Sequence, residues 1–543
     1  MLKNPKYVYG RIDRYVTASL NFGEFILNKI QENRDKIALI NGSTHEQLTY
    51  GEIAQEAMNI AISLGRMGIK KGDVIAVSSE NRREFWSSII GIVCSGAVAT
   101  TINIGYTNDE LKHVCGIAKP KFIFLSPLAY KTHAKIYKAL PYLKKIIIFG
   151  DDRLPNTILY KDIALPNNGG VNDKKEGYGL TDNIKYEDFT PADVDTNNDT
   201  LFILYSSGTT GLPKGVMITH LNVITLCSPS TPIPTLKGLS ITPWYHTMGL
   251  VSTLAGFTKG STTVYLPKFD VDLYLKTVEK YQISQLTVVP AALIALCKCK
   301  LTYDTSSVLM VFCGAAPLYE ETAKAVRERF PSVQAVLQGY GMTETTLAIT
   351  LNFNPDKIGS VGTVISHTVV KVVNPETREV LGPNQEGEIC VKSVMVMKGY
   401  IGKDRKEDFD DEGFLRTGDI GYYDEEQYFY IVDRLKELIK YKAYQVPPAE
   451  IEALLLRHPG IREAGVVGAP HPTAGEVPIA FVALQPGYNL TEKDIQDFVA
   501  EKLSNPKHLR GGVRFIDEIP KNQTGKMLRR ELRKMVKTKK SKL

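Results

Sequence analysis

Short apolar runs and longer amphipathic segments alternate along the first 150 residues. The runs have the length and apolar character of buried strands and lie at 37–40, 73–78, 121–125 and 145–149. The segments between them carry apolar side chains at helical spacing, at 50–67, 83–94 and 131–140. This alternation predicts parallel sheets covered by helices, and therefore an α/β fold.

The alternation resumes after a polar, loop-rich stretch at 151–199. Helices are expected at 271–280 and 320–330, and strands at 285–289, 308–312 and 335–337. Two short strands, 369–373 and 387–391, are typical of an antiparallel β subdomain.

A domain boundary is expected near residues 433–436, between a hairpin at 421–432 and a helix that starts at 447. The pattern predicts a large N-terminal domain, residues 1–434, of helix-covered sheets with a β subdomain. Residues 435–543 form a small α+β C-terminal domain of ordinary domain size.

Composition narrows the possible partners. The length of 543 residues exceeds what one hydrophobic core supports. The net charge of +7 is spread out and densest in the C-terminal tail, where no aromatic residues are interleaved, so a solvated helix is favoured over nucleic-acid binding. Seven scattered cysteines suit a reducing compartment. Gly, Ser and Thr interrupt the most apolar stretch, 89–104, so no membrane span is expected.

Residues 205–215 carry the clearest chemical signal, because they combine glycines, hydroxyls and a lysine directly after an apolar run. Glycine lets backbone N–H groups turn toward an anion, and the hydroxyls and the lysine add donors and charge. The pattern is not a Walker A loop, since no Ser or Thr follows Lys214. A flexible polar turn is the alternative to a nucleotide phosphate loop. The candidate phosphate ligands are Ser206, Ser207, Gly208, Thr209, Thr210 and Lys214.

A second group of candidates follows the strand at 335–337. Tyr340 can stack on a base, Thr343 can bind phosphate, and Glu344 is a hard oxygen ligand suited to Mg²⁺. The alternative is a glycine-rich turn with an N-capping threonine. Gly314 follows another strand, and Asp419 offers one carboxylate that can accept from both ribose hydroxyls.

These segments, in this order, resemble the adenylate-forming enzymes: acyl-CoA synthetases, 4-coumarate–CoA ligases and beetle luciferases. The resemblance runs from about residue 30 to the C-terminus. It implies that Glu344 holds Mg²⁺ and that Asp419 and Arg434 bind the ribose of ATP. It assigns contacts with adenine and phosphate to Gly314, Ala315, Ala316, Gln338, Gly339, Tyr340, Gly341, Met342 and Thr343.

The same resemblance gives the C-terminal domain a mobile role. Lys526 bridges the carboxylate nucleophile and the α-phosphate, and Lys436 is the hinge. The domain then rotates, so that Lys526 leaves and the face with Lys440 and Lys442 arrives for transfer to coenzyme A. Ala443 stands where the family usually has glycine, near the pantetheine path. The ATP-binding set implied for this domain is Lys436, Gln445 and Lys526.

The acid itself is selected elsewhere. The chain most resembles insect luciferase-like fatty acyl-CoA synthetases, and by that resemblance His246 positions the acyl carboxylate. Beetle luciferases usually carry a serine and an arginine where this chain has Leu347 and Leu226. Both changes leave apolar surface, which suits an alkyl chain at about 0.8 kcal/mol per buried methylene. The expected acyl pocket comprises Leu226, His246, Met248 and Leu347.

These observations predict an AMP-forming ligase that couples a medium- or long-chain fatty acid to coenzyme A with Mg-ATP. The alternatives are a luciferase, which oxidises adenylated luciferin with O₂, and a 4-coumarate-type ligase for aromatic acids. The last residues, Ser541, Lys542 and Leu543, match the peroxisomal targeting tripeptide, so a peroxisomal import receptor is an expected partner.

Overall fold

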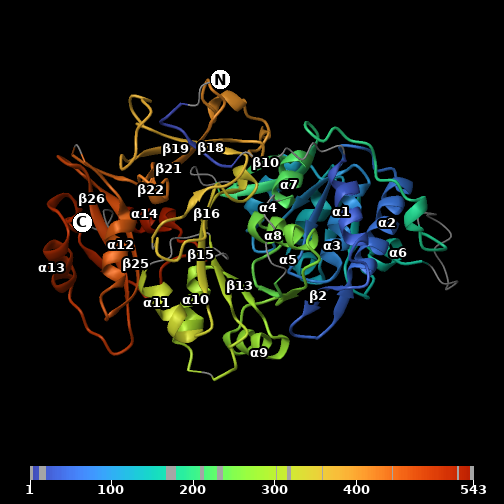
Figure 1. The fold of residues 1–543 in the computed structure, drawn as a ribbon, viewed down its shortest axis with the longest axis horizontal. Helices are drawn as coiled ribbons and strands as arrows, with labels where there is room; N and C mark the ends of the chain where they lie inside the picture. Colours follow the sequence, from blue (N-terminus) through green and yellow to red (C-terminus); the bar gives the residue numbers. More distant parts are fainter. Residues whose placement is uncertain are drawn as a thin grey trace.

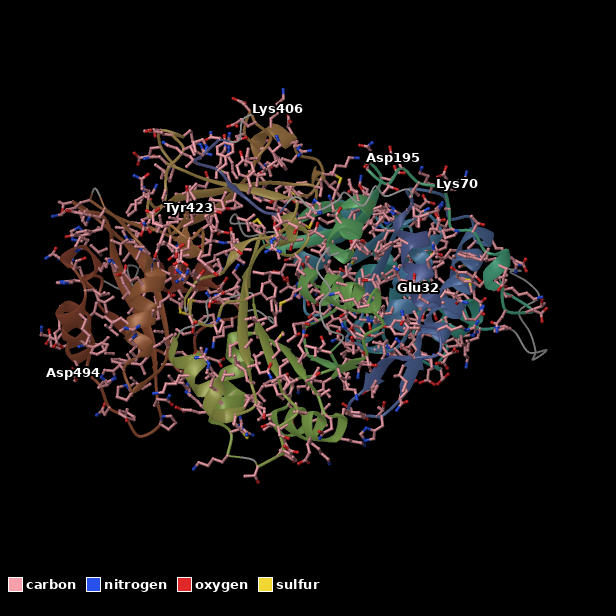
Figure 2. All side chains as sticks on the ribbon, viewed as in Figure 1. Glu32, Lys70, Asp195, Lys406, Tyr423 and Asp494 are labelled. Atoms are coloured by element: carbon pink, nitrogen blue, oxygen red, sulfur yellow. The ribbon has the colours of Figure 1, made fainter. Side chains whose placement is uncertain are left out.

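The computed structural model describes residues 4–11, 20–166, 179–207, 213–228, 236–300, 302–314, 320–357, 359–442, 444–521 and 525–538. Figure 1 shows an N-terminal region of helices and sheets, a strand-rich region at the top of the view and a C-terminal region at the left. Exposed charged side chains such as Lys70, Lys406 and Asp494 lie around the outside (Figure 2), as the dispersed net charge predicts. The α/β prediction is confirmed.

The first large sheet has eight strands in the order β20-β10-β9-β5-β4-β6-β7-β8. Its central strands β5, β4, β6 and β7 are parallel, whereas β9 and β10 form an antiparallel hairpin. The strands are β4 Val74–Ser78, β5 Val98–Thr101, β6 Phe122–Leu125, β7 Lys145–Ile148, β8 Ile158–Leu159, β9 Thr200–Ser207, β10 Pro213–Thr219 and β20 Gly399–Tyr400.

The second large sheet has nine strands in the order β17-β16-β15-β14-β13-β11-β12-β2-β3. Strands β15, β14, β13, β11, β12 and β2 are parallel. The strands are β2 Ile37–Asn41, β3 Gln47–Thr49, β11 Gly238–Ser240, β12 Thr263–Tyr265, β13 Gln285–Val288, β14 Met310–Cys313, β15 Ala335–Tyr340, β16 Thr350–Asn352 and β17 Thr363–Val364.

Helices cover these sheets because their apolar residues recur on one side. Helix α2 begins with a capping box, in which Thr49 and Glu52 satisfy each other's backbone N–H groups, and its apolar side packs on α3 in a large shared core. The helices before the C-terminal region are α1 Phe22–Gln31, α2 Tyr50–Arg66, α3 Glu84–Cys94, α4 Asn108–Ala118, α5 Pro127–Ala139, α6 Lys161–Ala164, α7 His220–Cys227, α8 Thr247–Phe257, α9 Val271–Tyr281, α10 Pro290–Lys298 and α11 Glu320–Arg329.

An antiparallel sheet, β1-β18-β19-β21-β22, forms the predicted β subdomain. Its strands are β1 Val8–Tyr9, β18 Thr368–Val373, β19 Gly387–Ser393, β21 Leu415–Tyr423 and β22 Phe429–Arg434. Several expected bounds shift, most of all that of the hairpin, which begins with β21 at Leu415 instead of 421. Strand β14 begins at Met310 instead of 308. Helix α5 begins at Pro127 instead of 131, since the Ser126 hydroxyl accepts from the Ala129 N–H at 3.1 Å and caps the earlier start.

The C-terminal region has its own sheet and its own apolar clusters. Its elements are β23 Ile439–Tyr441, β24 Tyr444–Val446, α12 Pro448–Leu456, β25 Ile461–His471, β26 Gly475–Leu484, α13 Glu492–Lys502, β27 Val513–Phe515 and α14 Arg529–Thr538. Between β22 and β23 the chain leaves one sheet for another, while the boundary itself and a hinge at Lys436 stay predictions. Within the described residues, no helix has the length and apolar character needed to cross a membrane.

Candidate active site

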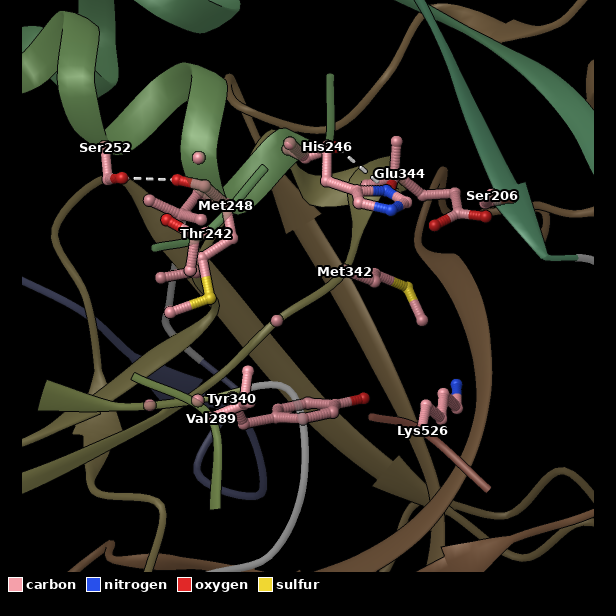
Figure 3. A pocket seen from close by; sticks show the side chains of 18 of the residues that line it. Ser206, Thr242, His246, Met248, Ser252, Val289, Tyr340, Met342, Glu344 and Lys526 are labelled. Carbon is pink, nitrogen blue, oxygen red and sulfur yellow. Dashed lines mark hydrogen bonds between the residues drawn. The ribbon is translucent and has the colours of Figure 1, made fainter. Parts of the chain in front are cut away.

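A cleft of about 2820 Å³ lies between the two large sheets, the β subdomain and the start of α14. Figure 3 shows part of it, with Ser206, Glu344 and Lys526 on one side and Thr242, Met248 and Ser252 on the other. Side chains from distant parts of the sequence therefore face one space, as the motif order predicts.

The β9–β10 hairpin carries the candidate phosphate loop to this cleft. Ser206 and Lys214 pair across the hairpin and line the cleft, and the backbone of Ser207 ends β9. Gly208, Thr209 and Thr210 lie outside the described residues. The Lys214 ammonium sits 4.7 Å from the centre of the Tyr400 ring, so the ring's negative face holds the cation near the loop.

Tyr400 is a residue that sequence reasoning missed. Its hydroxyl donates to Glu344 Oε1 at 2.6 Å and lies within hydrogen-bonding reach of Ser206. Strand β20 pairs with β10 through Val216 and Tyr400, which fixes the tyrosine beside the hairpin. The sequence offered only a Gly-Tyr pair without a recognisable local pattern, so the pairing partner was invisible.

The buried Asp419 and the half-buried Arg434 and Tyr340 form one hydrogen-bonded group. The antiparallel register of β21 and β22 places Asp419 opposite Arg434, with Arg434 Nε 3.0 Å from Asp419 Oδ1. The Tyr340 hydroxyl donates to Asp419 Oδ2 at 2.8 Å. Burial raises the pKa of Asp419, while Arg434 and Tyr340 oppose that change. A carboxylate held in one position at the cleft wall is what is expected of a residue that binds the ribose hydroxyls.

Lys526 reaches the cleft from the segment before α14. Desolvation in the cleft lowers the pKa of Lys526 to about 8, and repulsion from the positive charge of Arg434 acts in the same direction. The negative charge of Asp419 acts in the opposite direction and raises this pKa. The side chain also keeps contact with solvent in the cleft. A cation is thus present near neutral pH where two anionic substrates would meet.

Thr247 and Thr343 meet at the start of α8, next to His246 in the chain. The Thr247 hydroxyl donates to Thr343 Oγ1 at 3.0 Å, and His246 is the residue that precedes the helix. Desolvation lowers the pKa of His246 to about 4, so the imidazole is neutral at pH 7. A neutral imidazole can position a carboxylate by donating one hydrogen bond, without adding charge.

The glycines of β15 and the following turn allow close approach of backbone. A Cβ on Gly341 would lie 1.8 Å from the Leu347 carbonyl oxygen, and one on Gly339 would lie 2.8 Å from the Leu351 side chain. Glycine is therefore required at position 341 for packing alone. Further predicted ATP ligands that line the cleft are Gly314, Gln338 and Met342, while Ala315 and Ala316 lie outside the described residues.

The expected acyl-pocket residues all line the same cleft: Leu226, His246, Met248 and Leu347. One side of α8 presents Met248, Ser252 and Gly256 to the cleft at helical spacing. The second large sheet lies opposite and presents alternate residues to the cleft. From β13 and the residue after it these are Gln285, Thr287 and Val289, and from β14 and the residue after it they are Met310, Phe312 and Gly314.

The model of the AMP-binding enzyme family matches residues 27–401, and that of the AMP-binding enzyme C-terminal domain matches residues 450–526. This chain belongs to the AMP-binding enzyme family. It is 40% identical to luciferin 4-monooxygenase of Nipponoluciola cruciata, over 92% of this chain and 91% of that protein. It is 35% identical to a probable 4-coumarate–CoA ligase 1 of Dictyostelium discoideum, over 98% of both.

Among solved structures, ATP-bound MatB from Rhodopseudomonas palustris is similar, with a TM-score of 0.82 and 28% identity, over 95% of this chain and 99% of that chain. The predicted resemblance to adenylate-forming enzymes is confirmed by these matches. They fit a ligase and a luciferase equally, so the acid has to be argued from the pocket.

The lysines assigned to the second half-reaction lie apart from the cleft of this family member. Lys440 and Gln445 pair across the β23–β24 hairpin and are exposed, and neither they nor Lys442 are among the described residues that line the cleft. Lys436 does line it. Ala443 and residues 541–543 lie outside the described part of the chain.

Glu344 fits the role of a Mg²⁺ ligand in an AMP-binding enzyme. No group of three or more His, Cys, Asp or Glu side chains that could hold a metal occurs in the described residues. Mg²⁺ needs no such group, because it commonly takes one or two carboxylates together with substrate phosphates and waters. Glu344 is a nearly buried carboxylate beside the phosphate hairpin, as that arrangement requires.

Proposed function

We propose that this protein is an AMP-forming ligase that joins a medium- or long-chain fatty acid to coenzyme A. The observation that carries the proposal is the wall of the channel between α8 and the second large sheet. Most of its side chains are apolar or are already hydrogen-bonded within the protein, with Lys259 at the far end as an exception. Along most of its length such a wall accepts an alkyl chain without leaving polar groups of the ligand or of the protein unpaired.

The internal hydrogen bonds are specific. The Ser252 hydroxyl donates to the Met248 carbonyl, and the Gln285 amide donates to Thr287 Oγ1 at 3.4 Å. At the floor, the hydroxyls of Ser240 and Thr242 lie 3.0 Å apart and bond to each other. Leu226 and Leu347 add apolar surface. Luciferin or a hydroxylated aromatic acid carries polar atoms that this wall leaves without partners.

The length of the channel suits a chain of moderate length. From Val289 to Gln285 the wall runs four residues along an extended strand, or about 13 Å. From Met248 to Gly256 it runs eight residues along α8, or about 12 Å. An extended chain advances roughly 3.5 Å per three backbone bonds, so about eleven bonds fit.

The proposed reaction has two steps. A carboxylate oxygen of the acid attacks the α-phosphorus of ATP, the bond to the β-phosphate oxygen breaks, and pyrophosphate leaves. Lys526 lies between both anions, His246 orients the carboxylate, and Asp419 with Arg434 fixes the ribose. Bound Mg²⁺ would supply charge neutralisation on the phosphates, with Glu344 as its ligand. The thiolate of coenzyme A then attacks the acyl carbon and AMP leaves, with Lys440, Lys442 and Ala443 proposed on the face that serves this step.

A panel of acids tests the proposal and its alternatives. We expect thioester from alkyl acids with ATP and coenzyme A, and no light from luciferin in air. Strong light would establish the luciferase that the 40% identity suggests, and preferential use of hydroxycinnamic acids would establish the coumarate-type ligase.

Gly256→Leu tests the channel directly. A Cβ at Gly256 meets only the Ser261 side chain, at 3.8 Å, so a larger residue fits and projects into the channel. The preferred acid should become shorter by several carbons, while the KM for ATP stays at the wild-type value. An unchanged chain-length profile would place the acid elsewhere.

We also propose a peroxisomal location, on the tripeptide at residues 541–543 alone. A fluorescent protein fused ahead of the chain should co-localise with a peroxisomal marker. Deletion of the tripeptide should leave the fusion in the cytosol, and unchanged co-localisation would refute the assignment.

A further inference from the structure

A lysine stands at the end of the channel that lies away from the ATP site. Lys259 follows α8 by two residues and lines the cleft, in line with the stripe of Met248, Ser252 and Gly256. Helix α8 starts beside Thr343 of the ATP site, so its last turn marks the opposite end of the channel.

The register of the strands gives independent evidence for the position of this end of the channel. Gly238, Thr263, Gln285 and Met310 form one row across the N-terminal ends of the parallel strands, and all four line the cleft. Lys259 precedes Thr263 by only four residues. The ATP-binding turns, in contrast, follow the C-terminal ends of these strands, at Gly314 and beyond Tyr340.

The ammonium group of Lys259 has no anionic partner among the described residues. None of them forms an ion pair or a side-chain hydrogen bond with it. Desolvation lowers the pKa of Lys259, and the group that opposes the shift is the thiol of buried Cys227. Burial raises the pKa of that thiol to about 12, so it is uncharged at neutral pH and is no anionic partner.

Two hydroxyls near Lys259 already have hydrogen-bond partners within the protein. The Thr258 hydroxyl donates to the Cys227 carbonyl at 3.2 Å, and the Thr262 hydroxyl donates to the Ile37 carbonyl at 2.7 Å. The half-buried ammonium of Lys259 is therefore a charged group at this end of the channel that has no anionic partner among the described residues. Burying an unpaired charge is unfavourable, so an anion there would be bound favourably.

We propose that the acyl channel takes a medium-chain acid with a second anionic group at its far end, an ω-carboxylate, which pairs with Lys259. The proposal rests on the proposed ligase function and sharpens its substrate class. One carboxylate of an α,ω-dicarboxylic acid is adenylated, and the other is held by the lysine. The length of about eleven bonds between the two ends corresponds to a diacid of roughly twelve carbons.

Two other roles for Lys259 have to be separated by experiment. First, a lysine just after the end of a helix stabilises that helix, because its charge interacts favourably with the helix dipole. Second, a cation that lines the cleft could bind a phosphate group of coenzyme A. ATP–pyrophosphate exchange measures adenylation in the absence of coenzyme A, which removes the second role. Lys298 ends α10, is exposed and does not line the cleft, so Lys298→Met is a matched control for the first.

The experiment compares exchange rates with dodecanedioate and with dodecanoate for the wild type, Lys259→Met, Lys259→Arg and Lys298→Met. Methionine keeps the length of the side chain and removes its charge. For Lys259→Met we expect the ratio of kcat/KM for diacid over monoacid to fall by on the order of tenfold, because one partly solvated ion pair is lost. Lys259→Arg should retain most of the ratio, and Lys298→Met all of it.

An unchanged ratio in Lys259→Met would overturn the proposal, as would a wild-type enzyme that uses dodecanoate and rejects dodecanedioate. These outcomes leave the ligase function intact, because dodecanoate still supports exchange. Failure of both acids in the wild type, with active luciferin or hydroxycinnamate, would instead refute the proposed function. A parallel loss with both acids and a lower melting temperature would show that Lys259 is structural.

Discussion

The proposed bridge at Lys526 makes adenylation depend on the charge of one lysine. The cleft walls and Arg434 lower the pKa of this ammonium to about 8. Its protonated fraction then falls from about nine tenths at pH 7 to about one tenth at pH 9. Because only the cation can lie between the carboxylate and the α-phosphate, kcat/KM for acyl-AMP formation should fall about tenfold over this interval.

Pyrophosphate release without coenzyme A isolates this step, and Lys526→Arg provides the control. The guanidinium stays charged throughout the range, so its profile should lose the inflection near pH 8 even where its absolute rate is lower. Ionisation of the substrates affects both enzymes equally and cancels in the ratio of their rates. An inflection that persists unchanged in Lys526→Arg would show that another group titrates, and the bridging role would be refuted.

Three further changes test other parts of the site. Tyr400→Phe removes a hydrogen-bond donor that lies 2.6 Å from Glu344. The Mg²⁺ concentration that gives half-maximal adenylation should therefore rise, and kcat/KM for ATP should fall about tenfold or more. An unchanged Mg²⁺ titration would contradict this prediction. Lys526→Ala should block acyl-AMP formation yet convert supplied acyl-AMP to thioester, and Lys440→Ala should show the reverse; equal losses would argue against domain alternation. Asp419→Asn strips Arg434 of its anionic partner, so the KM for ATP should rise about tenfold or more in initial-rate assays, with a smaller effect on kcat.

Much of the scaffold was predictable because it follows local rules. The helix at 50–67 and the strand at 73–78 show the periodicity of their elements, and the structure has them at Tyr50–Arg66 and Val74–Ser78. The motifs also emerge at strand ends, which predicts that they converge in a parallel sheet. The start of α5 at Pro127 was missed because the periodic apolar pattern is clear only from about residue 131. The Ser126 cap, which starts the helix earlier, was not weighed against that pattern.

What escaped prediction depends on pairing between distant segments. Tyr400 acquires its place only when β20 joins β10, nearly two hundred residues earlier in the chain, and a two-residue strand has no periodicity to detect. Lys259 was similarly hidden, since a lysine near a helix end is ordinarily solvated. Only the register of the sheet opposite α8 shows that this one lines a channel.

The position of the charge decides how the channel selects among acids. An apolar wall alone discriminates weakly, by about 0.8 kcal/mol for each methylene it buries, and it accepts neighbouring chain lengths almost equally. A cation at a fixed depth adds a second reference point, because a diacid that is too short or too long cannot reach Lys526 and Lys259 together. Specificity then depends on whether the length of the diacid matches the spacing between two lysines, one at each end of an apolar channel. The activity with diacids should therefore peak sharply at one chain length, whereas the activity with monoacids should vary little over neighbouring chain lengths.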